Sequence, residues 1–275
     1  MGGQLDPGSG GRFSVRVSTD ADLPAVRRLV AADRLPGEPP LPDHLPEVPT
    51  AGKVFTLTGT DGQAHGVACL SVRRSDDAGL VHWLHAGEDL DAVAALLAFA
   101  RAELGRRTLH AFTAPATATR VPGLPMRHRP ATARALTAAG FTLATAQEYL
   151  LRDLNDPKPA APDDLIAHVT PLEDFRGWRL VVPGPGTTGV VASAVLSCPH
   201  PTSGMAVLWH LAVHPEHRHH GIGHRLLAQS LNLAAASSAR YLAAFTDPDE
   251  ESAMRLLAAQ DFDHVDTLAV HHRRP

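Results

Sequence analysis

The sequence predicts an α/β (α+β) chain in which two successive halves repeat one order of strands and helices. Segments with the apolar pattern of strands alternate along the chain with segments of helical periodicity. A proline-rich stretch at 155–162 separates the halves and is typical of a linker. Each half closes with a helix, then Gly140-Phe141 or Asp261-Phe262, then a last strand, which indicates an internal repeat.

The first half begins with an alternating strand, after which Asp20 or Asp22 can cap a helix. Proline excludes regular helix from 36–49, and 115–130 is a second long loop rich in proline, threonine and arginine. The expected elements are strands at 13–19, 53–58, 64–73, 80–85, 108–113 and 141–154, and helices at about 20–33, 88–104 and 131–139.

The second half follows the same pattern. Pro183-Gly184-Pro185-Gly186 is a turn between two strands, and the apolar run 206–213 is bounded by turn residues as a buried strand is. The expected elements are strands at 165–170, 178–182, 190–198, 206–213, 241–246 and 262–271, and helices at 226–239 and 249–259.

The predicted domain limits are a disordered leader at 1–12, a domain at 13–154, a linker at 155–164 and a domain at 165–275. The Gly-rich leader lacks the apolar core of a signal peptide, so we expect a cytoplasmic protein. A formal net charge of −4 argues against nucleic acid as a partner, and no apolar run is long enough to span a membrane. Two cysteines indicate no disulfide framework.

The most informative stretch follows the strand 206–213 and reads Arg218-His219-His220-Gly221-Ile222-Gly223. Its two glycines have no Cβ, so their backbone can approach a ligand closely. The helix that follows presents free N–H groups and the positive end of its dipole. A strand, glycine turn and helix in this order can cradle a pyrophosphate, and the arginines and histidines of the turn add positive charge.

This hexapeptide matches the [Gln/Arg]-x-x-Gly-x-[Gly/Ala] signature of the GNAT acyl-CoA-dependent N-acetyltransferases. The chain resembles the tandem-domain type of that superfamily, similar in layout to mycothiol synthase, with a degenerate N-terminal half. The resemblance implies two GNAT-like domains, each a mixed, mostly antiparallel twisted sheet flanked by helices, with acetyl-CoA as cosubstrate. The residues it assigns to acetyl-CoA are Leu211, Ala212, Val213, Arg218, His219, His220, Gly221, Ile222, Gly223 and His224.

In the first half the equivalent turn reads His85-Ala86-Gly87-Glu88-Asp89-Leu90. It lacks the signature and carries two acids, which would repel a pyrophosphate. We therefore expect a single acyl-CoA site, in the second domain.

The proton-transfer groups of the family are missing. The position of its glutamate base is Val207, and the position of its tyrosine acid is Leu257. His210 is the only titratable group on the strand, and regular alternation places it on the face opposite Val207 and Trp209 unless a bulge redirects it. His210 is thus a candidate base, although a lone histidine on a strand is more often a satisfied buried residue than a base.

The histidines between 217 and 224 lie near a helix start, but no Asp, Glu or Cys completes a recognisable metal set, so we predict no metal site. The leading hypothesis is transfer of an acetyl group from acetyl-CoA to a primary amine of a small molecule, by a monomer or homodimer. By analogy with tandem members, antibiotic-like or thiol metabolites are candidate acceptors. The alternative is a catalytically weak acyl-CoA-binding sensor or scaffold module.

Overall fold

The computed structural model describes residues 12–35, 48–49, 51–113, 121–155, 167–173, 175–184 and 189–275. The contacts between Cα atoms divide it into two compact units. The first unit comprises the described residues of Met1–Leu35, Asp43–Ala146 and Leu268–Pro275, and the second comprises those of Gln147–Thr267.

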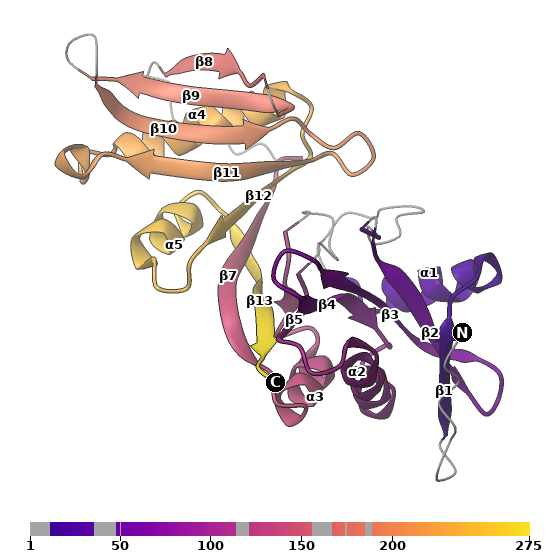
Figure 1. Cartoon of the computed structure of the whole chain (residues 1–275). Helices are drawn as coiled ribbons and strands as arrows, with labels where there is room; N and C mark the ends of the chain where they lie inside the picture. The colour runs from indigo at the N-terminus through magenta and orange to yellow at the C-terminus, as the bar shows by residue number, and fades with distance from the viewer. Residues whose placement is uncertain are drawn as a thin grey trace. The chain divides into compact units, whose positions relative to one another are not determined.

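The first unit is a sheet covered by helices on both faces (Figure 1). Its strands run in the order β1-β2-β3-β4-β5, antiparallel except for β4 and β5, and continue into the end of β13. The elements are β1 (Phe13–Val17), a 3-10 turn (Asp20–Asp22), α1 (Leu23–Ala32), β2 (Lys53–Gly59), β3 (Ala64–Arg73), β4 (Ala78–His85), α2 (Leu90–Leu104), β5 (Leu109–Ala111), β6 (Leu124–Pro125) and α3 (Pro130–Ala138).

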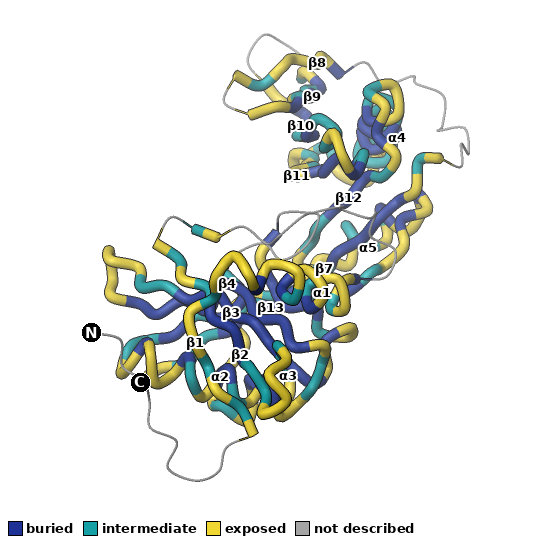
Figure 2. The backbone as a smooth tube through the Cα atoms, turned by 90° about the vertical axis from the view of Figure 1, so that its right-hand side faces the viewer, coloured by how far each residue is buried: buried dark blue, intermediate teal, exposed yellow. Residues whose placement is uncertain are grey.

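Two apolar clusters hold this unit together. On one face Val26 and Leu29 of α1 pack against Val67, Cys69 and Trp83 of the sheet. On the other face α2 and α3 pack on the larger core, so that β3 and β4 are buried between layers (Figure 2). Burial on both faces accounts for the continuous apolar character of β4, because neither side of that strand meets water.

The strands of the second unit run in the order β13-β7-β12-β11-β10-β9-β8, and β11 and β12 pair in parallel. Helix α4 packs on β10 and β11 and buries Leu226, Leu227 and Leu231. The elements are β7 (Thr142–Asp153), β8 (His168–Pro171), β9 (Gly177–Pro183), β10 (Val190–Ser197), β11 (Met205–Val213), a 3-10 turn (Pro215–His217), α4 (Ile222–Ala236), β12 (Tyr241–Thr246), α5 (Glu251–Ala258) and β13 (Asp263–Arg273).

The last strand of each half contributes to the sheet of the other half's unit. Residues 148–153 of β7 pair with β12 in the second unit, whereas residues 271–273 of β13 pair with β5 in the first. The compact units therefore differ from the predicted limits 13–154 and 165–275, because backbone pairing rather than chain order groups these strands. Apart from Asn155, the predicted linker at 155–164 lies outside the described residues and stays a prediction, as does the leader 1–11.

The predicted mixed fold of strands and helices is confirmed. The main difference in the second unit is that α4 begins at Ile222, four residues before the predicted start of that helix, so the second glycine of the signature lies inside its first turn. In the first unit β6 forms within the predicted loop 115–130, where Leu124 and Pro125 pair with β13. Such a short strand has no sequence periodicity from which to predict it.

Leu227 tests the core of the second unit. Its side chain is fully buried between α4 and the sheet, so Leu227→Ala should lower the free energy of unfolding by about 2–5 kcal/mol. Leu143→Ala is the control, since the Leu143 side chain is 57% exposed and its truncation should change stability by no more than about 0.5 kcal/mol. Denaturant unfolding followed by circular dichroism gives both values, and equal effects would contradict this packing.

Candidate functional site

The candidate site lies where β11 and β12 stop pairing. Their parallel ladder runs from Met205–Tyr241 to Leu208–Ala244, yet β11 continues to Val213 and β12 to Thr246. His214 N donates to Val191 O of β10, so with period two the backbone groups of Leu211 and Val213 point away from β10. The backbone groups of Leu211 and the N–H of Val213 are therefore directed to an extended ligand on the side where β12 has separated, whereas Val213 O already accepts from Arg218.

The turn that follows β11 leads into α4 through two residues in the left-handed region, His219 at φ 64° and Gly221 at φ 74°. Gly221 is the N-cap of α4 and no side chain caps the helix there, so its first N–H groups are unsatisfied by a cap. A left-handed turn before a helix N-terminus turns backbone N–H groups toward an anion. This backbone geometry is compatible with the predicted pyrophosphate cradle, which stays a prediction.

The side chains of this turn are ordered by contacts within it. Arg218 Nε donates to Val213 O at 3.1 Å, and His220 Nδ1 lies 2.7 Å from Arg218 O. His224, in the first turn of α4, lies within 2.9 Å of Gln260 Nε2. The structure thus brings the predicted cofactor-binding residues together along one continuous edge from Leu211 to His224, although no ligand tests their role.

His210 is redirected by a β-bulge. Val195 of β10 pairs with His210, but the next residue, Leu196, pairs with Leu208, so Trp209 is the extra residue on β11. The bulge reverses the alternation, and His210 lies on the same face as Val207, not opposite it as regular alternation predicts. Its ring is exposed, and its Nε2 lies 3.2 Å from Ser193 Oγ.

Leu257, which stands at the position of the family's proton donor, is buried in the core of the second unit. Glu250 lies at the start of α5 and is exposed. Among the described residues, no group of three or more His, Cys, Asp or Glu side chains is arranged to hold a metal ion. Nor is any described helix long and apolar enough to cross a membrane.

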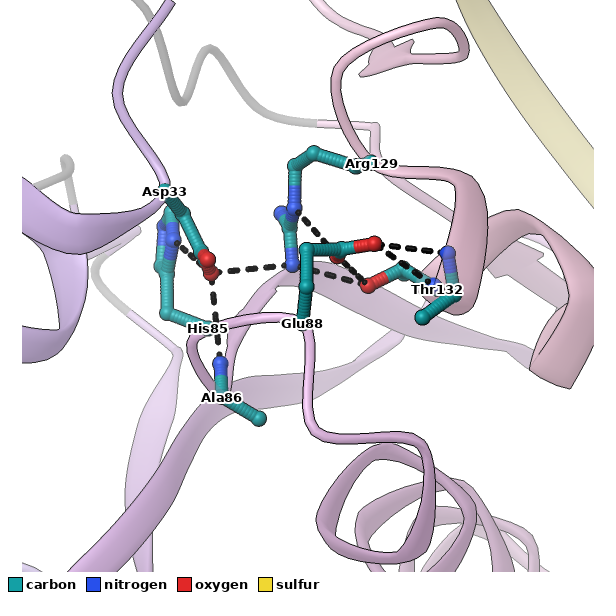
Figure 3. Close-up of polar contacts among 7 residues, drawn as sticks. Asp33, His85, Ala86, Glu88, Arg129 and Thr132 are labelled. Carbon is teal, nitrogen blue, oxygen red and sulfur yellow. Dashed lines mark hydrogen bonds and ion pairs between the residues drawn. The ribbon is translucent and has the colours of Figure 1, made fainter.

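The equivalent turn of the first unit is closed by its own carboxylates (Figure 3). Asp89 caps α2 by accepting from the backbone N–H groups of Asp91 and Ala92 at 2.9 and 3.2 Å. Glu88 points to α3, where it accepts from Ala131 N at 2.7 Å and Thr132 N at 3.2 Å. The two acids therefore occupy the N–H groups at the starts of α2 and α3. The sequence led us to expect that these acids would repel a pyrophosphate, whereas the structure shows that they take the place of an anion.

Arg129 joins this turn to α1. Its guanidinium contacts Glu88 at 3.3 Å and Asp33 at 3.1 Å, and His85 Nδ1 lies 3.1 Å from the same oxygen of Asp33 (Figure 3). Arg129 is therefore a buried residue whose contacts are structural. Residues 114–120 and 36–47 of the two predicted loops lie outside the described residues.

Burial and charge set the titration of this network. Burial raises the pKa of Asp33. The hydrogen bond with His85 and the charge of Arg129 lower it by more than burial raises it, so the pKa of Asp33 lies below its ordinary value. Burial lowers the pKa of His85, and Arg129 lowers it as well, against the opposing effect of Asp33. The network therefore holds an ionised Asp33, a charged Arg129 and a neutral imidazole.

Residues 147–262 match the model of the acetyltransferase (GNAT) family. This part of the chain is therefore similar to a GNAT domain. The matched span covers the separated strands β11 and β12, the turn and helix α4, so the family and the fold support an acyltransferase. No curated protein sequence matches the chain.

Solved structures with the same fold span nearly the whole chain. A GCN5-related N-acetyltransferase from Sphaerobacter thermophilus has 16% identity and a TM-score of 0.65, with 97% of each chain covered. A tandem GNAT protein from the clavulanic acid biosynthesis pathway has 15% identity and a TM-score of 0.58, with 94% of this chain and 98% of that chain covered. A GNAT-family acetyltransferase from Colwellia psychrerythraea has 12% identity and a TM-score of 0.56, with 95% and 100% covered.

The neighbours of His210 were not predicted from the sequence. Ser193, which contacts the His210 ring, and Arg179, which lies two strands away, belong to strands 178–182 and 190–198 that were predicted only as elements. Alternation along these strands gives the face of each residue, but the pairing register that places them beside His210 depends on the bulge at Trp209.

The buried network of the first unit predicts a pH-dependent stability. The His85 pKa is lowered in the folded state, so below an ordinary imidazole pKa of about 6.5 the unfolded chain binds more protons and unfolding becomes easier. From pH 7.5 to 5.5, His85→Gln should lose less stability than the parent, by up to about 1.4 kcal/mol per pH unit below 6.5. Between pH 7.5 and 9 the free energies of unfolding of the two proteins should change in parallel with pH. Parallel curves at all pH values would contradict the lowered pKa of His85.

Proposed function

We propose that the second unit transfers an acetyl group from acetyl-CoA to the primary amine of a small molecule. The observation that carries this proposal is the separation of β11 from β12 beside an uncapped helix start, within a domain of the GNAT family. An extended, anionic cosubstrate needs both features, since its amides pair with a strand edge and its phosphates need N–H donors and positive charge.

The residues proposed to hold acetyl-CoA fall into two groups. Backbone groups of Leu211 and Val213, on either side of Ala212, pair with the pantetheine amides. The turn and helix start bind the pyrophosphate through N–H groups and positive side chains. The members of this second group are Arg218, His219, His220, Gly221, Ile222, Gly223 and His224.

Acetyl-CoA supplies the activated thioester, and the protein aligns it with the amine. The amine nitrogen forms a bond to the acetyl carbon, the carbon–sulfur bond breaks, and the sulfur leaves with the electron pair. The amine must also lose a proton, which His210 accepts as general base before it passes to water. Alignment of the two reactants contributes several kcal/mol to the rate, so a single base suffices.

The first unit is proposed to be a GNAT-like domain without a cosubstrate site. Its strand, turn and helix follow the order of β11, the turn and α4, but Asp89 already accepts from the first N–H groups of α2. A pyrophosphate would have to displace that carboxylate. We therefore expect one acetyl-CoA per chain.

Gly221 and Gly87 provide a matched test of this difference. Both have positive φ, 74° and 58°, and neither has an atom within 4 Å of an added Cβ, so aspartate imposes similar backbone strain at each. Gly221→Asp should weaken acetyl-CoA binding at least tenfold, because its carboxylate faces the phosphates. Gly87→Asp should leave the affinity unchanged. Calorimetry on the parent should give one site per chain; two equal sites, or equal losses in both variants, would refute the assignment.

Release of CoA with a panel of small amines tests the activity itself. The parent should release CoA, and His210→Ala should lower turnover by roughly 10- to 1000-fold, the scale of a general base, while acetyl-CoA affinity changes little. The acidic limb of the pH–rate profile should also change in the variant. Unchanged turnover and profile would make His210 structural. Acetyl-CoA binding without CoA release from any amine would favour the sensor or scaffold alternative.

A further inference from the structure

Helix α4 covers one face of the second unit's sheet, and His210 lies on the other face (Figure 1). In the paired register Thr170, Arg179, Val195 and His210 form one row across these strands. The opposite face carries the core residues that pack on α4, such as Leu180 and Ala194. Thr170, Arg179 and His210 are exposed. The candidate base therefore stands at one end of a row of solvent-accessible side chains.

Arg179 is the positive charge of this row. It makes no hydrogen bond or ion pair with any residue of the described chain, and the neighbours it faces across the sheet, Thr170 and Val195, carry no charge. A guanidinium presents paired N–H donors that match a carboxylate in bidentate geometry. An unpaired arginine beside a reaction centre is suited to an anionic group of the substrate.

An aromatic pair borders the same face. Trp209, the bulged residue, packs edge-to-face on Phe175 with ring centroids 6.3 Å apart, and the two side chains are 44% and 39% exposed. Phe175 lies over Gly177, where an added Cβ would come within 2.9 Å of its ring. Gly177 pairs with Ser197 on the His210 face, so the rings lie on that face as well. They offer an apolar surface next to the base and the cation.

We propose that the acceptor is a small amine that also carries a carboxylate, with an apolar body between the two groups. This proposal rests on the acetyltransferase function proposed above. His210 receives the proton of the amine, Arg179 binds the carboxylate, and the apolar body lies against Trp209 and Phe175. Arg179 is two strands from His210, so their Cα atoms are about 10 Å apart. That separation suits an amine and a carboxylate on opposite ends of one small molecule.

Two amines that differ only in the carboxylate test this assignment. Para-(aminomethyl)benzoate has the amine and the carboxylate at opposite ends of a rigid ring, and benzylamine lacks the carboxylate. With the parent, KM for the acid should be at least tenfold lower than for benzylamine. Arg179→Gln should raise KM for the acid about tenfold with little change in kcat, because the interaction is equal in ground and transition states, and should not affect benzylamine.

Two further variants separate the bidentate contact of Arg179 from a general effect of charge. Arg179→Lys should retain part of the preference, since it keeps the charge but loses the bidentate geometry. Arg255→Gln removes an exposed arginine of α5 that pairs only with Glu251 at 3.5 Å, and should leave the preference intact. Equal KM values for the two amines in the parent, or equal effects of Arg179→Gln and Arg255→Gln, would overturn the proposal while leaving the acetyltransferase function standing.

A binding measurement separates failure of the acceptor assignment from failure of the function. Calorimetry in the presence of CoA gives the affinity of each amine without turnover. If no amine releases CoA, the proposed function fails. Tighter binding of the acid that is lost in Arg179→Gln then still supports the anion site. Equal binding of both amines, or binding of neither, overturns it.

Discussion

Strand β11 changes neighbours half-way along its length, and the chemistry of the second unit depends on that change. Up to Leu208 the strand is paired on both sides, with β10 and with β12. Beyond it only β10 remains, so backbone groups that a continuous sheet would satisfy are left to a ligand. The bulge at Trp209 occurs at the same point. The bulge that turns His210 to the face of Val207 therefore lies at the point where the strand edge becomes free of β12.

The two strand–turn–helix segments of this chain differ at only a few positions that decide whether the turn can receive an anion. Both turns contain a left-handed glycine, Gly87 or Gly221, and both lead into a 15-residue helix. In the first unit a carboxylate at the N-cap, Asp89, satisfies the helix start, and Glu88 does the same for α3. In the second unit the N-cap is a glycine with no side chain, so an external anion can take that place.

The acids of the first unit's turn belong to a buried network that compensates the charge of Arg129. Arg129 is enclosed between Asp33 and Glu88, and removing either acid would leave part of its charge uncompensated in a buried position. The network links α1, the turn before α2 and the start of α3. The segment that could have become a second ligand site thus holds the layers of its own unit together.

The sequence by itself determined most of the order of elements and the repeat, and it predicts a cradle at 218–223, because periodicity, turn residues and the glycine signature are local properties of the chain. It also showed that Leu257 and Val207 cannot transfer protons. Three features were decided only by the tertiary structure. These are the exchange of the last strands between units, the face of His210, and the neighbours Ser193 and Arg179. Each depends on strand register and pairing, which join residues far apart in sequence, and a single extra residue in β11 reverses the face of every residue after it.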